Sequence, residues 1–218
     1  MKIVKKIVFS LTIVLMVFSM QSCVEIVEEI TVNEDQSGSM SLSAGLSGTN
    51  SLLGLLGSFA DIAPLGDLER EVEIFVGKLK AQEGITNVRF SKIKSGGKYA
   101  LSFDFKDSKS LNNALYAVSD QEKKFFQPSF YKIKKNKYQR KNITNWANML
   151  IEKEKENMPD EAIFDLMEYR AIVNVPRPAT RVKADDVKIS KNRKTISTKN
   201  FVSDILDNRI DTGMKVKW

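Results

Sequence analysis

Apolar and polar side chains alternate along several stretches of the chain, a period of two that is typical of strands with one buried face. In residues 24–33 the apolar positions are Val24, Ile26, Ile30 and Val32, and in residues 39–46 they are Met40, Leu42 and Ala44. A cluster of turn-forming residues separates the two stretches. We therefore expect a β-hairpin of residues 24–33 and 39–46, with its turn near residues 35–38.

A helical period follows from residue 67. Its apolar stripe consists of Leu68, Val72, Phe75, Val76 and Leu79. Acidic residues in the first turn, lysines in the last and Gly84 beyond the end predict a helix that stops before Gly84. The stretches ITNVRFSKI and YALSFDF then predict a second hairpin with its turn at residues 95–98. Asp107 or Ser108 is expected to cap the next helix, at residues 108–118.

The remaining elements are shorter. Residues 130–141 predict a hairpin that turns near Asn136, residues 145–158 a helix, and residues 163–175 a long strand that is ended by prolines. The tail predicts two strands around a turn at residues 191–193, a helical turn near 201–206 and a closing strand at the C-terminus. This order of elements predicts the α+β class: an antiparallel sheet built from hairpins, with about three helices packed on it, in a single domain.

The N-terminus has the layout of a secretory signal peptide. Lys2, Lys5 and Lys6 precede an apolar run, residues 7–20. This run is shorter than the roughly 20 apolar residues of a spanning helix, so a signal peptide is favoured over an uncleaved membrane anchor. Cleavage would reduce the formal charge from +7 to +4, because three of the 34 basic residues lie in the removed segment. So small an excess is weak evidence for a nucleic-acid partner, and export disfavours one further.

The only cysteine, Cys23, follows the apolar run after Met20, Gln21 and Ser22. These four residues resemble the lipobox of bacterial lipoproteins, in which an apolar residue at minus three and a small residue at minus one precede an invariant cysteine. The resemblance implies that residues 1–22 are a lipoprotein signal peptide and that Cys23 begins the mature domain, residues 23–218, carrying acyl chains. Two or three such chains make attachment effectively permanent, at about 0.8 kcal/mol per buried methylene. A free buried thiol is the alternative interpretation.

The residue types exclude several chemistries. The chain has no histidine, which excludes Ser-His-Asp and Cys-His catalytic arrangements and any histidine-containing zinc site. With one cysteine it forms no internal disulfide. The stretch DILDNRIDTG lacks the regular ligand spacing and terminal glutamate of an EF-hand. Phosphate-binding, dinucleotide-binding and nucleophile-elbow motifs do not occur, so we expect no catalytic residues, no metal and no cofactor.

Residues 36–60 carry no charged side chain. From residue 51 the apolar spacing predicts one face of a helix, which Gly54 and Gly57 weaken by about 1 kcal/mol each. This face consists of Leu52, Leu55, Leu56, Phe59 and Ile62. Two interpretations stay open: a loop and short helix that cover the core, or an apolar surface that contacts a lipidic ligand or the membrane.

The densest run of charge is FYKIKKNKYQRK, residues 130–141, which contains no acidic residue. Its basic residues are Lys132, Lys134, Lys135, Lys137, Arg140 and Lys141. The run is typical of an edge hairpin that lysines keep soluble and unpaired. It also fits a basic patch that approaches anionic lipid headgroups or an acidic envelope polymer, where each charge contributes up to about 1 kcal/mol.

Several stretches, taken in order, resemble the envelope lipoproteins of the LppM-like type. They are the lipobox cysteine, VEIVEEITVNEDQSGSMSLS, YALSFDFKDSKSL and the late YRAIVNVPRP with a final strand after it. The resemblance covers most of the mature chain and implies an α+β fold of the lipid-binding type. Many members carry a C-terminal membrane helix, for which this sequence has no second apolar stretch. Cys23 is the one functional residue that the resemblance carries over.

These patterns predict a lipid-anchored, non-enzymatic lipoprotein of the bacterial cell envelope, expected at the outer membrane on its periplasmic or surface side. The expected partners are the membrane, reached through the N-terminal acyl chains, and an apolar or lipidic ligand. The alternative is an adaptor or assembly subunit that binds another envelope protein through an open strand edge or through residues 51–63. A hydrolase that works through carboxylates alone is a third, less favoured class.

Overall fold

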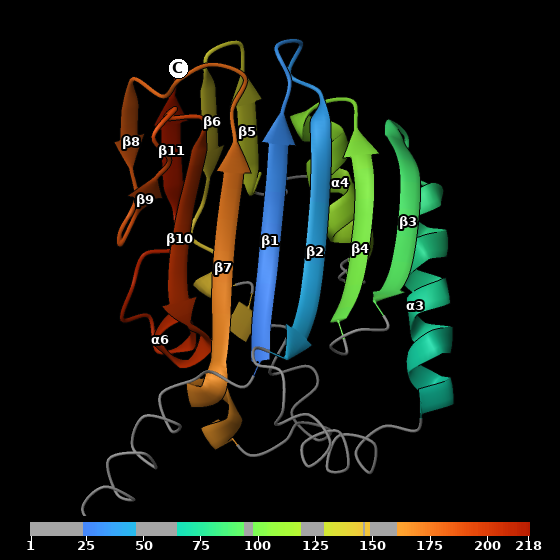
Figure 1. Ribbon diagram of the computed structural model, residues 1–218. Coiled ribbons are helices and arrows are strands. Elements are labelled where there is room, and N and C mark those ends of the chain that lie inside the picture. The colour runs from blue at the N-terminus through green and yellow to red at the C-terminus, as the bar shows by residue number, and fades with distance from the viewer. Residues whose placement is uncertain (1–23, 47–64, 94–97, 119–128, 146, 149–160) are drawn as a thin grey trace, which may run out of the picture.

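The computed structural model describes residues 24–46, 65–93, 98–118, 129–145, 147–148 and 161–218 (Figure 1). The strands are β1 (Val24–Val32), β2 (Gly38–Leu46), β3 (Ile85–Ile93), β4 (Lys98–Phe105), β5 (Tyr131–Lys134), β6 (Lys137–Arg140), β7 (Met167–Asn174), β8 (Arg181–Lys183), β9 (Lys188–Ile189), β10 (Thr195–Phe201) and β11 (Met214–Lys217). The helices are α3 (Leu65–Lys80), α4 (Ser108–Val118), α6 (Val202–Leu206) and the 3-10 helix η2 (Glu161–Leu166). All described elements therefore lie within residues 24–218.

The strands form two sheets in one domain of mixed α and β structure. The larger sheet has the order β3-β4-β2-β1-β7-β10-β9, and the smaller has the order β5-β6-β11-β8. In Figure 1 the larger sheet faces the viewer, with α3 and α4 behind its right half. The prediction of a single antiparallel sheet was wrong in two respects, since there are two sheets and the central strands β1 and β7 are parallel. Local turn patterns do not reveal pairing between strands so far apart in the chain.

The three predicted hairpins are confirmed as the antiparallel pairs β1–β2, β3–β4 and β5–β6. The first hairpin closes on Gly38, which pairs with Val32. A Cβ at Gly38 would collide with the carbonyl oxygen of Thr31 and would lie 2.6 Å from Cζ of Phe105. A residue without a side chain is therefore required where the turn enters β2.

Several other predictions are confirmed, two need correction, and one is largely untested. The strands β9, β10 and β11 and the short helix α6 lie where the tail predicted them. The strand predicted at 163–175 begins later, because its first residues form η2 and only Met167–Asn174 are a strand. β8 was missed, and most of the helix predicted at 145–158 lies outside the described residues.

Among the described residues, the larger of two apolar clusters lies between the two sheets and the helices, and the smaller consists of Tyr169, Ala171 and Ile205. The inward face of the larger sheet contributes Ile30, Val32, Met40, Phe103 and Phe105. The smaller sheet contributes Tyr131, Ile133, Tyr138, Met214 and Val216, and the helices contribute Leu79 and Leu111. Because side chains alternate along every strand, each sheet presents its other face to solvent. The outward face of the smaller sheet carries a concentration of basic side chains.

Candidate functional site

In β5, β8 and β11 of the smaller sheet, Lys or Arg alternates with an inward-facing residue, while in β6 Lys137 and Gln139 face outward. The stretches are YKIK in β5, KYQR in β6, RVK in β8 and MKVK in β11. In β5 and β11 the inward residues are buried and the lysines exposed. The alternation therefore directs an apolar face to the core and a basic face to solvent.

The register of the sheet arranges the outward side chains in two rows. One row consists of Lys132, Gln139, Lys215 and Lys183, and the other consists of Lys134, Lys137, Lys217 and Arg181. We call these eight positions the basic sheet face. Strands in a sheet lie about 4.8 Å apart, and residues two apart on one strand are separated by about 7 Å. Seven cationic groups thus occupy neighbouring positions on one face of a four-stranded sheet, and Gln139 is the only neutral member of the eight.

Among the described residues, none of these seven cations forms an ion pair or a side-chain hydrogen bond. On the larger sheet, by contrast, two cations are paired with glutamates. Arg170 lies 2.8 Å from Glu25 and Lys199 lies 2.6 Å from Glu168. Like charges directly opposite each other on neighbouring strands destabilise a sheet, so the basic sheet face works against folding.

Protection of a sheet edge explains only part of the pattern. β5 and β8 are the edges of the smaller sheet, where lysines prevent pairing with other chains. β6 and β11 have neighbours on both sides, yet they supply Lys137, Lys215 and Lys217. The central lysines therefore need another explanation, and binding of an anionic partner supplies one.

An open depression of about 370 Å³ adjoins one row of the basic sheet face. Its charged and polar lining residues are Gln139, Arg140, Lys141, Asn142, Lys183, Asp185, Asp211 and Lys215. The two aspartates are engaged by backbone groups: Oδ1 of Asp211 accepts a hydrogen bond of 2.8 Å from Gly213 N–H, and Oδ2 of Asp185 accepts one of 3.4 Å from Asp211 N–H. The acidic groups thus lie beside the basic sheet face and not within it.

The structure divides the basic run predicted from the sequence. Lys132, Lys134 and Lys137 lie on the basic sheet face, and Lys135 and Lys141 are exposed beside it. Arg140 was wrongly placed in the patch, because it is only 1 % exposed and points into the core, on the same side of β6 as Tyr138. The sequence analysis missed four members of the face: Arg181, Lys183, Lys215 and Lys217. The repeated alternation of Lys or Arg with apolar residues was the signal that could have found them.

Arg140 instead belongs to a buried polar cluster that joins the two sheets. Its guanidinium donates to both carboxylate oxygens of Glu28 at 3.3 Å, to the hydroxyl of Tyr169 at 2.6 Å and to the carbonyl oxygen of Thr212 at 2.5 Å. The Tyr169 hydroxyl in turn donates to Glu28 at 2.5 Å. Burial, together with the charge of Glu28, holds the pKa of Tyr131 and of Tyr138 above the usual range. The cluster is enclosed by the core, so we assign it to the architecture and not to ligand binding.

A second surface feature lies on the inward face of the larger sheet. Phe90 on β3, Leu101 on β4 and Leu42 on β2 are consecutive cross-strand neighbours and form what we call the apolar row. Phe90 is 37 % exposed and Leu42 is 42 % exposed, although they lie on the face that elsewhere forms the core. The ring of Phe90 stacks on that of Tyr99 at 6.0 Å between centroids. The apolar row is thus a contiguous, half-open apolar surface.

Helix α3 lies beside this surface. Of its predicted inward stripe, Leu79 is buried, but Phe75 is 40 % exposed, which corrects the prediction for that residue. Phe75 lies one turn before Leu79 on the same face of α3. On this helix face, Leu79 therefore packs into the core, whereas Phe75 stays partly in solvent.

Two groups of predicted site residues lie outside the described part of the chain. They are Cys23 and the apolar face of Leu52, Leu55, Leu56, Phe59 and Ile62. Among the described residues, no helix has the length and apolar character needed to cross a membrane. The same residues contain no group of three or more acidic or cysteine side chains placed to hold a metal ion.

Comparisons with known proteins give little to identify the chain. Neither a protein-family model nor a curated protein matches it. Among solved structures, the folded domain of the LppM protein of Mycobacterium tuberculosis, determined by NMR, is similar over 90 % of each chain, with 14 % sequence identity and a TM-score of 0.43. LppM gives its name to the type of protein that the strand patterns resemble, but a likeness at this level establishes neither family nor function.

Proposed function

We propose that the protein is a lipid-anchored lipoprotein of the bacterial cell envelope that binds an apolar or lipidic ligand without catalysing a reaction. The proposal of a ligand rests on the apolar row. Its residues Phe90, Leu101 and Leu42 are in register on the core-facing side of the sheet, and Phe90 and Leu42 stay well exposed. Isolated exposed apolar residues are ordinary, whereas contiguous ones mark interaction surfaces.

The position of the row relative to the proposed anchor supports a lipidic ligand. β1 begins at Val24, directly after Cys23, and Glu28 of β1 is the cross-strand partner of Leu42. Four residues of strand span about 13 Å, so an anchor at Cys23 would keep the row close to the bilayer surface. A hydrocarbon chain laid along the row would gain roughly 25 cal/mol for each Å² of apolar surface that leaves water.

Lipid extraction from the purified protein tests the ligand. A chain of residues 24–218, which contains every described element, is purified without detergent, and bound lipid is measured by native mass spectrometry. We expect lipid on the unaltered chain and its loss from the variant Leu42→Ser with Phe90→Ser. The matched control is Ile189→Ser with Phe201→Ser, which removes two similarly exposed apolar side chains elsewhere and should keep the lipid. An unaltered chain that carries no lipid, or a row variant that retains it, contradicts the ligand.

The anchor is tested on the full chain. In cells given labelled palmitate, we expect the unaltered chain to incorporate label and to partition with membranes. The variant Cys23→Ala should do neither. Label on the variant would contradict acylation at Cys23, whatever the fate of the apolar ligand.

The second candidate function is an adaptor that binds another envelope protein. Its support is β3, a nine-residue strand at the edge of the larger sheet, which could accept a strand from a partner. The register of β3 shifts between Thr86 and Arg89, and a bulge of this kind bends an edge away from partners, which favours the ligand-binding proposal. Crosslinking from β3 that captures one discrete envelope protein would favour the adaptor.

A further inference from the structure

We infer that the basic sheet face docks onto the headgroup layer of an anionic phospholipid bilayer. This surface is separate from the apolar row, and its assignment stands whether or not the protein carries an apolar ligand. The face presents seven cations in two rows of four positions, and among the described residues none of the seven forms an ion pair, with Asp185 and Asp211 lying beside the face. A layer of lipid phosphates would provide negative charges that pair with these cations.

The composition of the face selects the kind of anion. Six of its seven cations are lysines, which act as flexible point charges, and only Arg181 offers the planar fork that recognises one phosphate bidentately. Separate, flexible point charges spread over four strands fit many anions at once better than one small anion in a fixed pose. The eight positions include no aromatic side chain, so they lack the stacking platform of single-stranded nucleic-acid sites. They also lack the aromatic anchors that dominate protein–protein interfaces.

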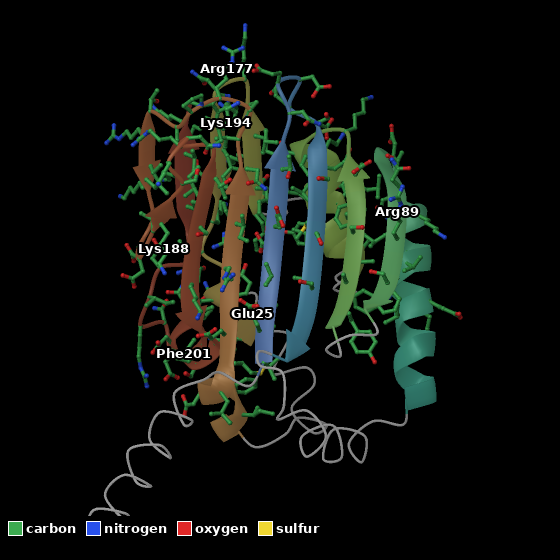
Figure 2. The ribbon with its side chains drawn as sticks, in the orientation of Figure 1. Glu25, Arg89, Arg177, Lys188, Lys194 and Phe201 are labelled. Carbon is green, nitrogen blue, oxygen red and sulfur yellow. The ribbon has the colours of Figure 1, made fainter. Side chains whose placement is uncertain are left out.

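The charge distribution also gives the molecule a preferred orientation. On the outward face of the larger sheet, which carries Glu25 and faces the viewer in Figure 2, Arg170 is paired with Glu25 and Lys199 with Glu168. The smaller sheet packs against the opposite side of the larger sheet, so the basic sheet face points away from that viewer-facing surface. An anionic surface would therefore attract one side of the molecule and leave the other in water.

Vesicle binding tests the inference. The chain of residues 24–218 is mixed with vesicles of phosphatidylcholine alone or of phosphatidylcholine and phosphatidylglycerol in equal parts, and bound protein is measured by sedimentation. We expect binding to the anionic vesicles only, and we expect it to weaken steeply as salt is added. Each cation near an anionic surface strengthens binding by up to about fivefold. Changing Lys134, Lys137, Lys215 and Lys217 to Gln should therefore weaken binding at least about tenfold.

The matched control changes four exposed lysines outside the face, Lys106, Lys109, Lys188 and Lys191, to Gln, for the same loss of net charge. It should bind within about twofold of the unaltered chain. Equal weakening by both variants would overturn the docking face, because net charge alone would then explain binding. Equal binding to neutral and anionic vesicles would overturn it as well. If soluble polyphosphate bound as tightly as the anionic vesicles, the face would be assigned to a dissolved polyanion. That result would overturn the proposal that the face docks on a bilayer.

A second measurement needs no variant. The full chain is reconstituted in the same two kinds of vesicle, and its lysines are labelled with a water-soluble amine reagent. Lys132, Lys183 and Lys215 should be labelled several-fold less in anionic than in neutral vesicles, while Lys188 on the larger sheet should be labelled equally in both. Equal labelling of the basic sheet face in the two vesicles would overturn the inference.

Discussion

Replacement of Arg140 by methionine should destabilise the fold more than most single changes, because it separates charges that the core has enclosed. Arg140 is 1 % exposed and Glu28 is 6 % exposed. Without the guanidinium, the carboxylate of Glu28 keeps only the hydroxyl of Tyr169 as a described partner, and the carbonyl oxygen of Thr212 loses its donor. The lost donors leave buried polar groups unpaired, which is costly at residues with so little exposure.

The expected cost follows from the number and quality of the lost contacts. The two bonds to Glu28 are long, at 3.3 Å, whereas those to Tyr169 and Thr212 are short. Removal of one partner of a buried ion pair costs about 3–5 kcal/mol, mostly because the other charge stays buried. Domains of this size unfold with a free energy of about 5–15 kcal/mol, so the variant would lose a large fraction of its stability.

Urea unfolding followed by circular dichroism measures the loss. The informative comparison is the triple variant Glu28→Leu, Arg140→Met and Tyr169→Phe, in which the polar groups leave together. Replacing a whole buried ionic cluster by apolar residues of similar size is often neutral or stabilising, so the triple variant should recover most of the stability. If Arg140→Met alone costs less than about 1 kcal/mol, or if the triple variant is as unstable as the single one, the reasoning about enclosed charge is refuted.

Two further predictions concern local structure. Gly38→Ala should cost about 1–3 kcal/mol in urea unfolding, because its Cβ would collide with the Thr31 carbonyl. Gly77→Ala on α3, where a Cβ meets nothing within 4 Å, should instead stabilise the fold by about 0.5–1 kcal/mol. A Gly38→Ala variant of unchanged stability would contradict the clash. Asp107→Ala should cost about 1 kcal/mol near pH 7, since Oδ1 of Asp107 accepts the Ser110 N–H at 2.8 Å and caps α4, while Ser108→Ala should cost little. That hydrogen bond is the main cause of the lowered pKa of Asp107, so its contribution is present above the ordinary pKa of 3.8 and is lost as the pH falls through the lower folded value; a cost that stays constant down to pH 2 would contradict it.

The local structure of this protein could be predicted from its sequence because the hydrophobic period and the turn residues act over short distances. The hairpin of β1 and β2 is the clearest case, with Val32 opposite Gly38 where the turn cluster predicted it. The cap at Asp107 was one of two candidates that the sequence offered. The parallel pairing of β1 with β7 could not be predicted, because nothing in either strand specifies a partner more than a hundred residues away.

The buried carboxylate of Glu28 interrupts the alternating pattern of β1. The alternation of β1 places Val24, Ile26, Ile30 and Val32 on one face, as predicted. Strict alternation also places Glu28 on that face and Val27 on the other, a break in the pattern that the sequence shows but does not explain. The explanation lies in Arg140 and Tyr169, which are 112 and 141 residues from Glu28. A break in alternation at an acidic residue is therefore a signal of a buried partner elsewhere in the chain.

The same strand, β6, shows how the fold separates structural from surface charge. Arg140 points inward and has four hydrogen bonds to three partners, whereas Lys137 on the opposite face has none among the described residues. Burial requires that an inward charge be satisfied, because an unpaired one would cost several kcal/mol. An outward charge is solvated by water and needs no partner in the protein. The lysines on β6 and β11 are therefore not required for the stability of the fold. The lysines of β6 and β11 are like-charge neighbours that the fold does not need, and they do not protect a sheet edge. A partner outside the molecule explains them best.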